Sequence, residues 1–134
     1  MVRQKKTGEF LTEVELEFMN VVWATGGGTV REILAELNKT HERAYTSVAT
    51  VLKIMEKKGF LVSDRQDRSL VYHPAVQKTA YQKTTLRNLS SKLFNDTPAA
   101  LVARLVEDED VTNEMLEEIK ALLDERLGEE NGSR

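Results

Sequence analysis

The chain has 134 residues, of which 40% are hydrophobic and 31% are charged. This composition is that of an ordinary soluble globular protein, and the length fits one domain or one domain with an appendage. There is no cysteine, which excludes a disulfide scaffold, a thiolate metal site and a cysteine nucleophile, and which fits a reducing cytosol. The net charge is −3, but residues 1–82 carry 12 basic and 10 acidic side chains, whereas residues 83–134 carry 7 and 12. Because the acidic second part masks a modestly basic first part, the total charge does not exclude nucleic-acid binding.

The start of the chain, "MVRQKKTGEF", has a basic run with no apolar stretch behind it. This pattern predicts no signal peptide, and no segment is long and apolar enough to span a membrane. We therefore expect a cytoplasmic protein without a membrane partner.

Two capped helices are predicted first. Thr12 with Glu15 is a capping box that opens a helix through "EVELEFMNVVWAT", and the glycines at 26–28 end it. Thr29 with Glu32 is a second capping box, which opens the short amphipathic helix "VREILAELN".

The third predicted helix, in "AYTSVATVLKIMEKKGFL", has two contrasting faces. One face is apolar, and Gly59 stands where a left-handed residue would end the helix. The opposite face carries hydroxyls and lysines without any carboxylate, although exposed helix faces usually carry charges of both signs. The apolar face is made of Val48, Val51, Leu52 and Met55, and the polar face of Thr46, Thr50, Lys53 and Lys57.

Two short extended runs follow, "FLVSD" and "SLVYHP", with the charged segment "RQDR" between them. This pattern predicts a β-hairpin with a charged tip, which Pro74 ends. From about residue 77 onward the pattern is only helical. The sequence thus predicts a mainly α protein with a small β-hairpin, in three parts: an N-terminal domain over 8–76, a helical region over 77–127 and a disordered tail over 128–134.

The C-terminal helices carry wide apolar stripes that a short segment cannot bury well alone. A second copy of the segment would bury them in a two-fold symmetric homodimer. The alternative is that these helices fold back onto the first domain. The residues that we expect at the dimer interface are Leu86, Leu89, Leu93, Leu116, Ile119 and Leu123.

Three helices followed by a charged hairpin are the components of a winged helix-turn-helix, in which the second helix of the pair enters the DNA major groove. Hydroxyls suit base edges, and lysines further along the helix suit phosphates. One alternative is a merely solvated face. Another is a winged helix that only binds proteins, although such a module would expose Leu, Phe or Tyr there. The predicted DNA-binding residues are Arg43, Tyr45, Thr46, Ser47, Thr50, Lys53, Lys57, Arg65 and Arg68.

Four segments, "LTEVELEFMNVVW", "TVREILAEL", "TSVATVLKIMEKKGFL" and "RSLVYHPAV", resemble the penicillinase-repressor family of bacterial transcription factors, the BlaI, MecI and CopY type. The resemblance covers about Leu11 to Leu127. It implies a dimeric repressor that binds a palindromic operator through an N-terminal winged helix, with a C-terminal helical dimerisation region.

The chain departs from this family in three places. The recognition helix of the family usually has an arginine where this chain has Ile54, and the cysteine cluster of the copper-responsive branch is missing. Penicillin-responsive members are released by cleavage of an Asn-Phe bond, and the matching pair here is Arg104-Leu105. The resemblance therefore implies a regulatory protease as a partner without implying its cleavage site.

No other chemistry is predicted. His41 and His73 lack metal-ligand spacing, "EDED" lacks the glycine and spaced ligands of a calcium loop, and "GGG" follows a helix without a G-K-[ST] sequence. Neither a cofactor nor a metal is expected. We find no nucleophile-base pair and expect that the protein is not an enzyme.

Overall fold

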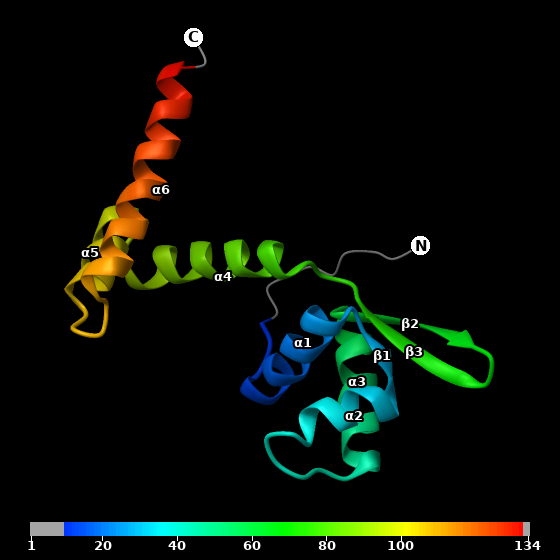
Figure 1. Cartoon of the computed structure of the whole chain (residues 1–134). Helices are drawn as coiled ribbons and strands as arrows, with labels where there is room; N and C mark the ends of the chain where they lie inside the picture. Colours follow the sequence, from blue (N-terminus) through cyan, green and yellow to red (C-terminus); the bar gives the residue numbers. More distant parts are fainter. Residues whose placement is uncertain (1–9, 133–134) are drawn as a thin grey trace. The chain divides into compact units, whose positions relative to one another are not determined.

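The computed structural model describes residues 10–132, and side chains up to residue 129. Predictions about residues 8, 9, 133 and 134 lie outside the described residues. Figure 1 shows the elements in chain order: α1 (Glu13–Thr25), β1 (Gly28–Thr29), α2 (Val30–Leu37), α3 (Tyr45–Lys58), β2 (Leu61–Gln66), β3 (Ser69–Pro74), α4 (Lys78–Leu93), α5 (Pro98–Glu107) and α6 (Asn113–Gly132). The predicted order of three helices and a hairpin, followed by helices only, is confirmed.

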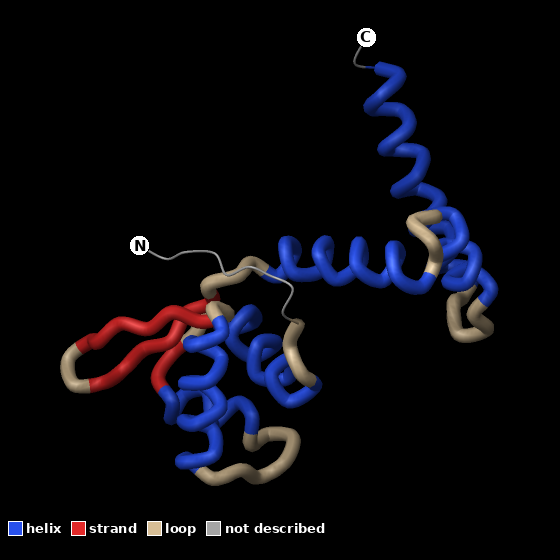
Figure 2. The backbone as a smooth tube through the Cα atoms, turned by 180° about the vertical axis from the view of Figure 1, so that it is seen from behind, coloured by secondary structure: helices blue, strands red, loops and turns tan. Residues whose placement is uncertain are grey.

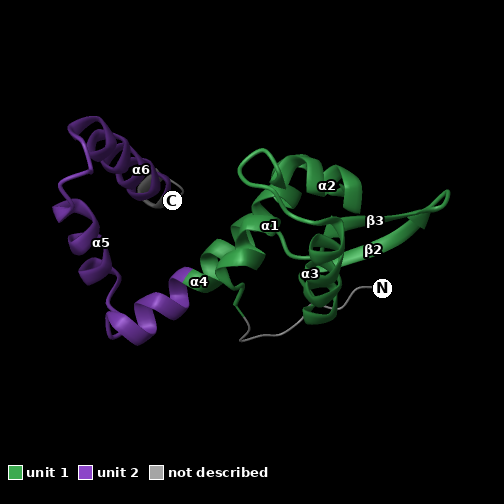
Figure 3. Cartoon of the chain, turned by 90° about the horizontal axis from the view of Figure 1, so that it is seen from below, with its two compact units in different colours: residues 1–85 green, residues 86–134 purple. Residues whose placement is uncertain are grey.

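The chain divides into two compact units, residues 1–85 and 86–134, which are coloured separately in Figure 3. The division falls inside α4, because Tyr81 near the start of this helix packs on the first unit. Its ring lies 5.9 Å from that of Trp23 and 6.1 Å from that of Phe60, and its hydroxyl accepts a hydrogen bond of 2.8 Å from the Leu11 amide. The first compact unit thus extends past residue 76.

Both predicted capping boxes are present. The Thr12 hydroxyl accepts from the Glu15 amide at 3.1 Å while the Glu15 carboxylate accepts from the Thr12 amide at 3.0 Å. Thr29 and Glu32 exchange the corresponding pair of bonds at 3.1 and 2.9 Å. These side chains satisfy amides that have no partner within the helix, so the start of each helix is encoded locally.

The glycines between α1 and α2 also build a sheet. Gly26 has a φ of 87° and ends α1. Gly27 has a φ of 109°, and a Cβ atom there would lie 2.0 Å from the Tyr72 carbonyl oxygen, so only glycine fits against β3. The next two residues form β1, which pairs antiparallel with β3 in a sheet of order β1-β3-β2 (Figure 2). The sequence predicted only the hairpin, because a strand of two residues carries no alternation.

The core of the first unit lies between the three helices and the sheet. Val48, Leu52 and Met55 of α3 are fully buried, as the apolar face of that helix predicted. Gly59 ends α3 with a φ of 96°, again as predicted. The remaining buried apolar residues are Phe18, Met19, Val22, Val30, Ile33, Leu37, Phe60, Leu61 and Tyr72.

The second unit consists, within its described residues, of helices joined by short turns. Thr112 opens α6, since its hydroxyl accepts from the Met115 amide at 3.2 Å. This helix continues to Gly132, so the prediction of disorder from residue 128 is wrong for residues 128–132. The glutamates there are good helix formers, and Gly128 is tolerated at an exposed position. Within the part of the chain that the structure describes, no helix has the length and apolar character needed to cross a membrane.

Candidate nucleic-acid interface

The outer face of α3 is open to solvent and free of negative charge. Thr46, Ser47, Thr50, Lys53 and Lys57 are all exposed. The Thr50 hydroxyl donates to the Thr46 carbonyl at 2.9 Å, which leaves its oxygen lone pairs available to accept from another group.

The one carboxylate of α3 lies away from this face. Glu56 is partly buried and accepts a hydrogen bond of 2.7 Å from the Ser63 hydroxyl of β2. The helix therefore presents hydroxyls and ammonium groups outward and keeps its acidic side chain engaged with the sheet.

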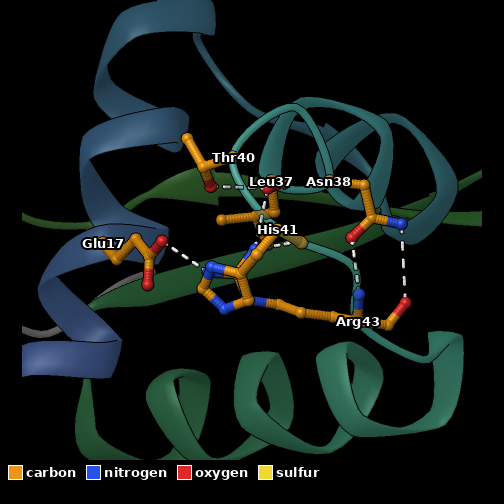
Figure 4. Close-up of polar contacts among 6 residues, drawn as sticks. All are labelled: Glu17, Leu37, Asn38, Thr40, His41 and Arg43. Carbon is orange, nitrogen blue, oxygen red and sulfur yellow. Dashed lines mark hydrogen bonds and ion pairs between the residues drawn. The ribbon is translucent and has the colours of Figure 1, made fainter.

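A cluster of polar contacts holds the turn between α2 and α3 (Figure 4). The Arg43 guanidinium donates to the carbonyl oxygens of Leu37, at 2.7 Å, and His41, at 3.1 Å, and forms an ion pair with Glu17 of α1. The Arg43 amide donates to the side-chain oxygen of Asn38 at 2.9 Å. These contacts tie the turn to both helices that precede α3.

Arg43 is the predicted DNA-binding residue whose placement differs from the others. Its side chain is only 11% exposed. The last carbonyls of a helix lack helical partners, so the C-terminal end of α2 attracts a guanidinium inward. The side chain of Ala44 offers no cap to α3, and the Arg43 cluster holds the turn directly before this helix. This structure supports a positioning role for Arg43, which sequence spacing alone does not reveal.

The hairpin brings two further cations to the same side as the start of α3. Arg65 lies in β2 and Arg68 in the tight turn, where Asp67 has a φ of 56°. Both arginines line an open groove of about 290 Å³. The groove is lined by residues of β1, α2, α3 and the hairpin: Thr29, Val30, Arg31, Tyr45, Arg65, Arg68, Ser69 and Leu70.

Sequence reasoning missed Arg31 as a residue of this site. It follows the Thr29 cap on α2, and nothing local distinguishes it from a solvated arginine. The pairing of β1 with β3 brings the start of α2 beside the hairpin, and the Arg31 guanidinium carbon then lies 5.2 Å from the centre of the Tyr45 ring. The only hint in the sequence was the position of Arg31 between the Thr29 cap and the apolar Ile33, where a side chain of α2 is expected to face solvent.

Other side chains near the interface are placed as follows. Ile54 is exposed on α3. His73 Nε2 lies 3.3 Å from Asp64 Oδ1 on the hairpin, where Asp64 is exposed and His73 is partly buried. Among residues 10–129, no group of three or more His, Cys, Asp or Glu side chains has the arrangement to hold a metal ion.

The residues predicted at the dimer interface lie on the helices of the second unit and on the last part of α4. Leu86, Leu89, Leu93 and Leu123 are exposed in the single chain, whereas Leu116 and Ile119 are partly buried. The exposed leucines make an apolar surface that a single chain leaves uncovered.

The fold and the charged face define a winged-helix DNA-binding protein: a helix-turn-helix pair with an exposed polar recognition helix, followed by a hairpin that carries arginines. The particular family follows from comparison with known proteins. Residues 11–125 match the penicillinase repressor family, and the chain belongs to this family of transcriptional repressors. The resemblance noted in the sequence is thus confirmed.

Relatives of known identity agree with this assignment. The penicillinase repressor of Bacillus licheniformis is 26% identical over 86% of this chain and 90% of that protein. The methicillin resistance regulatory protein MecI of Staphylococcus aureus (strain Mu50 / ATCC 700699) is 23% identical over 87% of this chain and 94% of that protein. The solution structure of the DNA-binding domain of the repressor BlaI is 31% identical, with a TM-score of 0.50, and the match covers 58% of this chain and 94% of that domain.

Proposed function

We propose that the protein is a homodimeric transcriptional repressor that binds a palindromic operator through α3 and the wing, which is the β2–β3 hairpin. The observation that carries this proposal is the exposed face of α3, which presents hydroxyls and lysines and no carboxylate. Likeness to the DNA-binding domain of the repressor BlaI supports it.

The proposal gives the exposed residues two roles. Thr46, Ser47 and Thr50 read base edges, since a hydroxyl donates or accepts and a threonine methyl packs on the methyl of thymine. The cations contact phosphates, which position the helix without reading sequence. They are Lys53 and Lys57 on α3 and Arg65 and Arg68 on the wing.

We expect Thr50→Ala to weaken binding to the cognate operator by about 1–3 kcal/mol and to leave binding to random duplex DNA unchanged. Contacts to bases distinguish one DNA sequence from another, whereas contacts to phosphates contribute affinity for every sequence. The measurement is a pair of titrations, one with a duplex selected by the parent protein from a random pool and one with a scrambled duplex.

Thr84→Ala is the matched control, because Thr84 is an exposed threonine of α4 outside the proposed interface. It should bind both duplexes as the parent does. Equal losses on both duplexes for Thr50→Ala would show that Thr50 only positions the helix.

Dimerisation is proposed through residues 77–127, where the exposed leucines of α4 and α6 offer an apolar surface. Two half-sites on DNA require two recognition helices, which a symmetric dimer supplies. Each half then contributes to one complex, and loss of the linkage leaves each domain with only its own weak affinity.

Release is proposed to occur by proteolysis in α5 or the loop after it. Val102, Leu105 and Val106 of α5 are exposed, and the acidic loop 108–112 connects it to α6. A cut here would separate the DNA-binding domain from the last helix. Arg104 and Glu107 are joined by an exposed salt bridge of 2.7 Å, which adds little to the stability of the segment.

This release step predicts that full-length protein disappears from cells when its target genes switch on. Immunoblots that follow both ends of the chain during induction would detect the two fragments. Persistence of the intact protein while the genes are derepressed would exclude proteolysis and indicate a ligand or partner.

A further inference from the structure

We infer that the groove between α2, the start of α3 and the wing is a clamp for a DNA backbone phosphate, in which the ring of Tyr45 holds Arg31 in place. The inference rests on the proposed DNA binding and deepens it, since it names a phosphate-binding residue on α2 and the residue that orients it.

The groove has the charge that a phosphate requires. Arg31, Arg65 and Arg68 come from α2, β2 and the wing turn, and no carboxylate lines the same space. None of the three takes part in a salt bridge with the side chains of residues 10–129. Three guanidinium groups that line one groove repel one another, and an entering anion relieves that repulsion.

Guanidinium groups also have the right shape. Their planar forks donate two parallel hydrogen bonds to phosphate oxygens, which an ammonium group does not do. The open groove of about 290 Å³ admits a phosphodiester together with part of its sugar.

The Tyr45 ring restrains the guanidinium group of Arg31. The Arg31 guanidinium carbon lies 5.2 Å from the ring centre, within the range of a cation–π contact, and Tyr45 remains 44% exposed. A free arginine side chain loses rotamer freedom when it binds, and a ring that already restrains it lowers this loss. Tyr45 therefore acts through Arg31, as a positioning residue.

The location selects DNA as the source of the phosphate. Tyr45 is the first residue of α3 and directly precedes Thr46, the first of the proposed base-reading residues. An anion in the groove therefore lies next to the bases that α3 would read. Arg65 and Arg68 line the wing side of the same groove. The three arginines would therefore contact one stretch of the DNA backbone.

The test uses the full chain and a duplex that the parent protein selects from a random-sequence pool. Arg31→Ala should weaken binding about tenfold, the loss expected for one hydrogen-bonded charge, and should make the salt dependence of log affinity shallower by about one unit. Arg87→Ala, which removes an exposed arginine of α4, is the matched control and should change neither quantity.

Tyr45 is tested by substitution in two backgrounds. Tyr45→Phe keeps the ring and should bind as the parent does, whereas Tyr45→Leu should lose several-fold in affinity. In the Arg31→Ala background, Tyr45→Leu should cost nothing further, because the side chain that it orients is gone. A full additional loss in that background would overturn the positioning role.

The phosphate itself is located by replacing single linkages of the selected duplex with neutral methylphosphonates. One linkage beside the half-site should weaken the parent and leave Arg31→Ala unaffected. No such linkage, or an Arg31→Ala protein that binds DNA normally and loses only a response to added inorganic phosphate, would overturn the clamp. A selection that enriches no sequence would instead overturn the proposed function, so the two failures are distinguishable.

Discussion

Leu123→Asp is expected to abolish the proposed dimer at micromolar concentration and to reduce operator affinity by about 100- to 10,000-fold, the range of a lost second binding event. Leu123 is 55% exposed in the single chain, so the new carboxylate stays hydrated there. In a dimer packed through α6 the same carboxylate would be buried without a partner, which is strongly unfavourable. The substitution therefore acts on association and spares the fold.

Sedimentation velocity measures the first effect, and titration of a two-half-site duplex measures the second. Ala121→Asp is the matched control, because it adds the same charge to an exposed position on the opposite side of α6. It should remain dimeric. A parent protein that already sediments as a monomer at this concentration would end the dimer proposal.

The second large effect concerns the ion pair between Glu15 and Lys58, which joins the first turn of α1 to the last turn of α3. Lys58 Nζ lies 2.7 Å from Glu15 Oε2, and Glu15 is only 5% exposed. Burial alone would raise the pKa of Glu15, but the hydrogen bond from Lys58, the bond from the Thr12 amide and the Lys58 charge together lower it below the usual 4.5.

Lys58→Met should therefore lower the free energy of unfolding at pH 7 by about 2–3 kcal/mol, since it leaves a buried carboxylate without its cation. Lys58 itself is 31% exposed, which keeps the effect below that of a fully buried pair. Urea unfolding measures the change. Lys57→Met removes the same charge from an exposed neighbour and should change stability by less than about 0.5 kcal/mol.

The effect of Lys58→Met should depend on pH in one direction. A carboxyl whose pKa is lower in the folded than in the unfolded chain stabilises the fold above its unfolded pKa, and this stabilisation is lost as the pH falls through the folded pKa. The stability difference between the parent and Lys58→Met should therefore be full at pH 7 and shrink as the pH falls below 4.5. A difference that stays constant down to about pH 3 would assign the loss to packing of the lysine stem.

Much of the fold was predictable because its signals are local. The capping boxes of Thr12 and Thr29 mark helix starts within four residues, and Gly59 marks the end of α3 by its left-handed backbone. The two faces of α3 were predictable because helical spacing separates buried Val48 from exposed Thr50 without any tertiary information.

The missed features depend on contacts between distant segments. Arg31 joins the groove only because β1 pairs with β3, and a two-residue strand leaves no trace in the sequence. Arg43 turns inward toward the Leu37 carbonyl at the end of α2 and toward Glu17, which lies 26 residues earlier in the sequence. Neither contact produces a periodic pattern in the sequence. From spacing alone, Arg43 is therefore grouped with the DNA-binding cations, and Arg31 is indistinguishable from an ordinary solvated arginine.

The glycine triplet between α1 and α2 has a consequence for how this repressor can diversify. Position 26 is open but needs a left-handed backbone, whereas position 27 is sterically closed to any side chain by the Tyr72 carbonyl. The wing tip is different, because residues 66–69 are exposed and pair only with one another. Insertions and new side chains at the tip should therefore leave the domain folded, whereas any side chain at position 27 would push β3 away from β1 at the root of the wing.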